Sequence, residues 1–149
     1  MADLHRAPEP HDVRAFAGLL RDAQQAVRGA ERAALEPFGI AGSTFRLLDL
    51  LGRDGPCGPA AAAAALGVSR PSITAWVNDL VAMELVDRAG LATDGRRARV
   101  ALTDEGERVW RAASDAVRRR QNRLLAVAVD PVEQASLLDA LQRIASVTS

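Results

Sequence analysis

The sequence contains no lysine and no tyrosine, only one cysteine and two histidines, and its 149 residues carry no formal net charge. The single cysteine, Cys57, excludes a disulfide within the chain. The two histidines, His5 and His11, stand apart from any cysteine or carboxylate cluster, so we expect neither a metal site nor another cofactor. A surface for a nucleic acid must therefore come from local clustering of the nineteen basic residues, all of them arginine.

Other function classes also lack their signatures. Neither a nucleophile–base pair nor a glycine-rich phosphate loop is evident, which argues against an enzyme. No apolar run approaches the length of a membrane-spanning helix, and the N-terminal segment lacks the basic-then-apolar order of a secretory signal. We therefore expect a cytoplasmic protein without a membrane partner. Its hydrophobic content of 48% can supply the core of one domain, or of a small head on a dimerising scaffold.

The two ends of the chain are predicted to be helical. Residues 1–11 contain prolines and few apolar groups, so we expect a flexible leader there. From Asp12 apolar residues recur at helical spacing until Pro37 and Gly39, which predicts a long amphipathic helix. A second amphipathic helix is expected from Pro131 to about Val147. The apolar stripes of these two helices can pair with each other.

Two short helices on either side of a tight glycine turn occupy the middle of the chain. Pro59 suits the first turn of one helix, Gly67 ends it, and Ser69 caps the next. A short helix, a tight turn and a second helix with a polar outer face form the helix-turn-helix signature of DNA-binding proteins. The candidate contacts to bases and phosphates on this second helix are Ser69, Arg70, Ser72, Thr74 and Asn78.

A β-hairpin is predicted to follow, with strands at residues 85–89 and 97–102. Turn residues such as Asp94 join the strands, and Thr103 then caps a long helix that runs to about Val129. The hairpin would form a wing whose tip residue Arg96 enters the minor groove, with Asp94 holding its guanidinium. The other candidate DNA contacts on the hairpin are Arg88, Arg97 and Arg99. The fold class expected is therefore mainly α with a small antiparallel wing.

Several of these candidates also have a purely structural interpretation. Helix capping alone explains Ser69, and Asn78 lies two turns into its helix, where simple exposure explains it. Asp94 and Arg96 can equally form a solvated charge pair in a hairpin. These alternatives stay open on the sequence alone.

Other conspicuous residues are expected to be structural. Trp76 and Trp110 should pack in the core, because a reader of duplex DNA has no unpaired base to stack on, although Trp110 could line a ligand pocket. Cys57, with no cation beside it in the sequence, is interpreted as a small hydrophobe rather than a redox sensor. The densest basic run should form a solvated face or pair with acidic residues of the first helix, such as Asp22 or Glu31. It comprises Arg118, Arg119, Arg120 and Arg123.

Three stretches of the sequence carry a family resemblance. Residues 40–48 and 63–74 precede and include the predicted helix-turn-helix, and residues 80–88 continue it. The most specific stretch is the wing, in which Thr93-Asp94-Gly95-Arg96-Arg97 is followed by Val100-Ala101-Leu102-Thr103-Asp104-Glu105-Gly106. These residues and the order of elements resemble the multiple-antibiotic-resistance regulator (MarR) family of bacterial winged-helix repressors, from about Asp12 onward.

The resemblance implies a homodimer with two reading heads on a pseudo-palindromic double-stranded DNA operator. In that arrangement residues 12–38 form a dimerisation helix, residues 40–104 the DNA-binding head, and residues 105–149 a linking helix and a C-terminal dimerisation helix. It also implies a small aromatic or phenolic effector that binds between scaffold and head and weakens DNA binding. The function expected is transcription regulation, by repression.

This sequence departs from the family pattern where relatives often carry a base or a turn glycine. The recognition helix has Arg70 as its only cation. Because neutralised phosphates dominate affinity, we expect a weaker operator complex or one that relies heavily on the wing. The acidic residues Asp79 and Glu84 keep an alternative function open, that of a winged-helix module that binds proteins and not DNA. The departing positions are Ala75, Asp79, Met83, Glu84 and Ala89.

Overall fold

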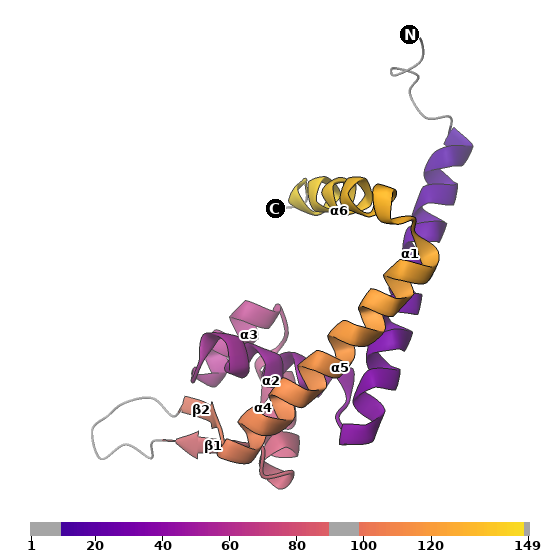
Figure 1. The fold of residues 1–149 in the computed structure, drawn as a ribbon. Helices are drawn as coiled ribbons and strands as arrows, with labels where there is room; N and C mark the ends of the chain where they lie inside the picture. Colours follow the sequence, from indigo (N-terminus) through magenta and orange to yellow (C-terminus); the bar gives the residue numbers. More distant parts are fainter. Residues whose placement is uncertain (1–9, 90–98, 148–149) are drawn as a thin grey trace.

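The computed structural model describes residues 10–89 and 99–147, which form a mainly helical chain with a two-stranded antiparallel sheet (Figure 1). The expected fold class is thereby confirmed. The elements in chain order are α1 (Pro10–Leu35), a short 3-10 helix (Glu36–Phe38), α2 (Gly42–Asp54), α3 (Pro59–Leu66), α4 (Arg70–Ala82), β1 (Val86–Ala89), β2 (Arg99–Leu102), α5 (Asp104–Ala128) and α6 (Pro131–Ser146).

Element boundaries differ from the sequence prediction in small ways. Helix α1 begins at Pro10, two residues inside the segment that was expected to be a flexible leader. Strand β1 begins at Val86, one residue later than predicted, and β2 is described from Arg99 onward. The predicted cap at Thr103 is confirmed, because its side chain accepts a backbone hydrogen bond at the start of α5, and the Asp130 side chain accepts one in the same way at the start of α6.

The long helices α1 and α5 lie side by side and connect two ends of the molecule (Figure 1). Helices α2, α3 and α4 and the sheet gather at one end of this pair. Helix α6 follows the other end of α5 and runs at a steep angle to α1 and α5 (Figure 1). None of the extensive helix–helix contacts among the described residues involves α6. Within one chain, α1 therefore packs along α5, but much of its apolar stripe stays exposed, including Phe16, Leu19, Leu20 and Val27.

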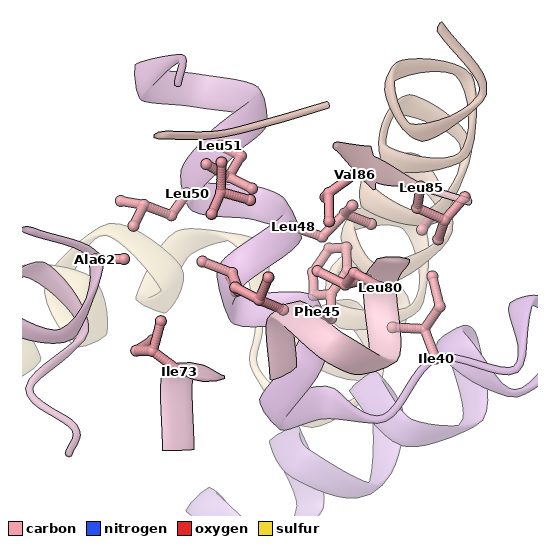
Figure 2. Close-up of a cluster of buried hydrophobic side chains, with 14 of the residues drawn as sticks. Ile40, Phe45, Leu48, Leu50, Leu51, Ala62, Ile73, Leu80, Leu85 and Val86 are labelled. Atoms are coloured by element: carbon pink, nitrogen blue, oxygen red, sulfur yellow. The ribbon is translucent and has the colours of Figure 1, made fainter. Parts of the chain in front are cut away.

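The hydrophobic core lies in the head, where α2, α3, α4, the sheet and the first half of α5 meet. Leu47 and Leu48 of α2, Ile73 and Leu80 of α4 and Val86 of β1 are essentially inaccessible to solvent. Figure 2 shows Leu48, Ile73, Leu80 and Val86 within this cluster of side chains. Apolar residues recur three or four positions apart on α2 and α4, so each helix turns one face to this cluster. The core fixes the relative placement of the helices that carry the candidate site.

A close backbone contact joins the wing to α5. The amide of Thr103 donates to the carbonyl of Leu85 at 3.1 Å, and the Thr103 hydroxyl donates to the carbonyl of Glu84 at 2.8 Å. The same hydroxyl oxygen accepts from the amide of Gly106 at 2.9 Å and caps the helix. A Cβ atom at Gly106 would lie 1.8 Å from the carbonyl oxygen of Leu85, so only glycine fits here.

Glu84 occupies a strained backbone position between α4 and β1. It has φ of 59°, the left-handed conformation that costs a residue with a Cβ roughly 1–2 kcal/mol. We expect Glu84→Gly to raise the free energy of unfolding by about 1 kcal/mol, measured by urea denaturation at fixed protein concentration.

The neighbouring position supplies the control for this substitution. Met83 has φ of −88°, which any residue adopts, so Met83→Gly should lower stability. Equal losses at the two positions would contradict the assignment of strain to Glu84.

No described helix is both long and apolar enough to span a bilayer.

Candidate nucleic-acid interface

The turn between α3 and α4 is built by local backbone chemistry. Gly67 adopts φ of 64° at the C-terminus of α3, a conformation that glycine reaches without steric cost. The amide of Val68 donates to the carbonyl of Ala63 at 3.1 Å. Ser69 then caps α4, since its Oγ accepts from the amide of Ser72 at 3.3 Å and lies 2.8 Å from the Ser72 hydroxyl. The predicted helix-turn-helix is present, with Ser69 in the structural role expected of it.

Helix α4 separates a buried face from a polar face. Ile73, Val77 and Leu80 are buried against the core. Arg70 is exposed and forms no ion pair with any described residue, whereas the exposed Thr74 donates its hydroxyl to the Arg70 carbonyl at 3.1 Å. Arg70 is therefore the cation of this helix that is available to a phosphate or a base edge, as the sequence indicated.

The base of the wing lies beside α4, and its strands pair in antiparallel register. Arg88 of β1 is opposite Val100 of β2, and the Arg88 guanidinium donates to Oδ1 of Asn78 on α4. Asn78 is exposed, as predicted, but its side chain is engaged. The structure thus brings together two candidates that the sequence placed on separate elements.

A second set of bonds ties the wing to the loop between α2 and α3. Arg99 donates to the carbonyl of Pro56 at 2.5 Å. Cys57 and Val100 exchange two backbone hydrogen bonds, of 3.2 Å and 2.8 Å. The loop therefore pairs with β2 through a single antiparallel bridge, on the side of β2 away from β1. Sequence reasoning missed this attachment, because it joins residues 43 positions apart and leaves no local pattern.

Cys57 is half-buried and packs against the core, as its interpretation as a small hydrophobe required. Burial raises the pKa of the Cys57 thiol, and the positive charge of Arg99 only partly opposes this effect. The cation that the sequence did not place near Cys57 is thus supplied by the wing. The thiol is nevertheless less ionised at neutral pH than a free cysteine, which is unfavourable for a reactive thiolate.

The other conspicuous residues have structural surroundings. Trp76 and Trp110 pack against the core as predicted, and the Trp110 indole also donates to Oδ1 of Asp49 at 3.1 Å. The arginine run on α5 is exposed, and its first member, Arg118, pairs with Asp115 of the same helix at 2.7 Å. Of the two expected arrangements, the solvated face is confirmed, and the ion pair of Arg118 is with its own helix and not with Asp22 or Glu31 of α1.

The tip of the predicted wing lies outside the described residues. This applies to Asp94, Arg96 and Arg97, the candidates to which the sequence gave the greatest weight for minor-groove contact. Of the candidate DNA contacts on the wing, the structure describes Arg88 in β1 and Arg99 in β2, at the base of the hairpin.

A pocket of about 310 Å³ lies between α1, α2 and α5. Its walls include Glu31, Arg46 and Arg118, and the Ser114 hydroxyl on the same wall is buried with no hydrogen-bond partner in residues 10–89 and 99–147. Arg46 also donates to the carbonyl of Leu66, the last residue of α3, at 2.7 Å. The pocket and the helix-turn-helix therefore share one side chain.

Comparison with known proteins agrees with this architecture. The family model described as the MarR family matches residues 38–97, and no curated protein matches the chain. The solved structure of Rv1404 from Mycobacterium tuberculosis is 28% identical, covers 95% of this chain and 97% of its own, and has a TM-score of 0.74.

Two further structures show the same fold in complexes. The MarR family protein Rv2887 from Mycobacterium tuberculosis, solved with DNA, is 21% identical with a TM-score of 0.71 and covers 93% of this chain and 98% of its own. The same protein with salicylic acid is 24% identical with a TM-score of 0.69 and covers 93% and 97%. The match of the MarR family model to residues 38–97 and the shared fold lead to one conclusion: this chain is similar to MarR family proteins over its helix-turn-helix segment and has the winged-helix fold of their solved structures.

Proposed function

We propose that the chain is a sequence-specific regulator of transcription that binds double-stranded DNA. The observation that carries the proposal is the exposed polar face of α4, which is capped by Ser69 and carries Arg70, a cation without an ion pair among the described residues. This face lies beside a wing that is anchored at its base. A helix with this outer face fits the major groove, while a wing reaches the adjacent minor groove. A MarR family protein of the same fold has been solved with DNA, which supports the proposal.

The proposed contacts divide between the two elements. Arg70, Ser72 and Thr74 of α4 would meet base edges and phosphates in the major groove. Arg96 and Arg97 would provide the wing contact, with Asp94 orienting Arg96. Since α4 offers one cation, most of the charge that meets phosphate must come from the wing.

We also propose that two copies of the chain form the working unit, through the helices at both ends. Among the described residues, almost all of the exposed large apolar side chains lie on α1, at the end of α5, or on α6 and its C-terminal flank, and not on the head. Burial of apolar surface is the main driving force for stable association. Two heads in a symmetric dimer would then read a pseudo-palindromic operator, and occupation of that operator would repress transcription. These side chains are Phe16, Leu19, Leu20, Val27, Val127, Val132, Leu138, Leu141, Ile144 and Val147.

The pocket between α1, α2 and α5 is the proposed site of a small effector. The guanidinium groups of Arg46 and Arg118 suit an anionic group, and the buried Ser114 hydroxyl, which has no hydrogen-bond partner among the described residues, offers a further polar contact. A protein of the same fold has been solved with salicylic acid, which supports a small aromatic or phenolic acid as the effector class.

Selection of bound duplexes from a random pool, repeated at several salt concentrations, tests the proposed function. We expect enrichment of an inverted repeat with half-site centres about one helical turn apart or a multiple of it. If no sequence is enriched while the protein is folded, DNA reading is excluded, and the alternative of a protein-binding winged-helix module is favoured.

Replacing Arg96 with alanine should weaken binding to the selected operator by about tenfold, because the wing loses its minor-groove side chain. Fluorescence anisotropy at physiological salt measures this effect. Arg119→Ala on α5, which removes the same charge from an exposed position away from the head, is the control and should leave affinity unchanged. Unchanged affinity of Arg96→Ala would refute the assignment of the wing.

A further inference from the structure

The hydrogen bond between Asn78 and Arg88 links the recognition helix α4 to the first strand of the wing. Asn78 is exposed two turns into α4, and Arg88 lies in the middle of β1. An arginine donor to an amide oxygen is a charge-assisted hydrogen bond, which is stronger than a bond between neutral groups. The two side chains on which the sequence placed DNA contacts are thus engaged with each other.

Packing alone does not fill the space between the wing and α4. A pocket of about 300 Å³ opens there, and its walls include Thr74 and Val77 of α4, Arg88 of β1 and Arg99 of β2. On its other side the wing is held to the loop between α2 and α3, by Arg99 at the carbonyl of Pro56 and by the Cys57–Val100 pair. The wing base is therefore anchored to that loop and, through the buried Val86, to the core, and the Asn78–Arg88 bond is the side-chain link across the remaining gap to α4.

We propose that Asn78 and Arg88 are a positioning pair that sets the wing relative to α4, and that they act on DNA recognition through each other rather than by touching DNA. The inference rests on the proposed function of duplex binding. A helix in the major groove and a wing in the minor groove strengthen each other's binding when the free protein already holds them at the spacing of the two grooves. If the wing had to be fixed in place during binding, the loss of its conformational entropy would weaken the affinity. The pair supplies this preorganisation.

The salt dependence of binding distinguishes a positioning pair from a phosphate contact. The logarithm of the observed binding constant, Kobs, falls linearly with the logarithm of the salt concentration. Each arginine that neutralises a phosphate steepens this fall by about 0.9, so removing that arginine makes the slope shallower. A side chain that only orients the wing changes the affinity at every salt concentration and leaves the slope unchanged. The two roles of Arg88 therefore give different results in one titration.

The experiment measures operator affinity across salt concentrations for Asn78→Ala, Arg88→Ala, the double variant and Asn78→Asp. We expect each alanine variant to bind about tenfold more weakly, with the wild-type slope, and the double variant to be no weaker than either single variant. Asn78→Asp keeps an acceptor for Arg88 and should restore most of the lost affinity. Asn122→Ala, an exposed asparagine on α5, and Arg119→Ala are matched controls that should bind as the wild type does.

Amide hydrogen exchange of the free protein provides a readout that does not need DNA. Both single alanine variants should raise the exchange rate of the β1 and β2 amides about fivefold or more, while exchange in the core of α2 stays unchanged.

A reduced salt slope for Arg88→Ala together with full affinity of Asn78→Ala would make Arg88 a direct phosphate contact and overturn the proposal. Unchanged exchange in both variants would also overturn it. If the wild type binds no duplex, the proposed function fails, and exchange still decides whether the pair positions the wing.

Discussion

Replacing Gly106 with alanine should lower the free energy of unfolding by about 3 kcal/mol, measured by urea denaturation at fixed protein concentration. The added Cβ would lie 1.8 Å from the carbonyl oxygen of Leu85 and 2.8 Å from its carbonyl carbon. Both atoms belong to the backbone, so no side chain can rotate to relieve the overlap. Either α5 must shift away from the turn before β1, or the Thr103 cap and its bonds must break.

The control for Gly106→Ala is Gly29→Ala in α1. Nothing lies within 4 Å of a Cβ at Gly29, and alanine is favoured over glycine in a helix by about 1 kcal/mol. We therefore expect Gly29→Ala to maintain or raise stability. A wild-type denaturation midpoint for Gly106→Ala would show that α5 and the wing are not in the contact described.

Two acidic substitutions on α6, Leu138→Glu and Leu141→Glu together, should convert the proposed dimer to a monomer. Leu138 is 56% exposed and Leu141 is 39% exposed in the single chain, so a partner is needed to cover them. Loss of four such leucines from a two-fold interface costs about 4 kcal/mol, or roughly a thousandfold in the dissociation constant. Sedimentation or light scattering at micromolar concentration measures the change, and operator affinity should fall with it.

Ser136→Glu provides the matched control on the same helix. Helical periodicity places Ser136 on the face of α6 opposite the two leucines, so it adds a charge without touching the apolar stripe. This variant should remain a dimer. A monomeric wild-type protein, or a double variant that stays dimeric, would exclude α6 from the interface.

The sequence predicted the head well because local signals specify its elements. Pro59, Gly67 and Ser69 are start and stop residues whose effects reach only a few positions along the chain, and each occupies its predicted role. The buried faces of α2 and α4 follow in the same way from helical spacing. The start of α1 was missed by two residues, since helix ends are the least constrained part of a periodic pattern.

The contacts that complete the candidate site were beyond sequence reasoning. Arg99 meets the carbonyl of Pro56 from 43 residues away, and the Trp110 indole meets Asp49 from 61 residues away. Such pairs depend on how finished elements pack, and an arginine in a strand has the same local signature whether it faces DNA or a carbonyl. For the same reason the sequence did not reveal that α1 and α5 lie against each other within the chain.

Whether this winged helix reads duplex DNA as a dimer is tested most directly on the selected inverted repeat. The measurement gives the number of chains bound per duplex and the affinity at several salt concentrations. We predict two chains per duplex and a linear fall of log Kobs with log salt, with affinity for the repeat at least about a thousandfold above that for random duplex at physiological salt. Equal affinity for the repeat and for random duplex, or one chain bound per repeat, would contradict the account.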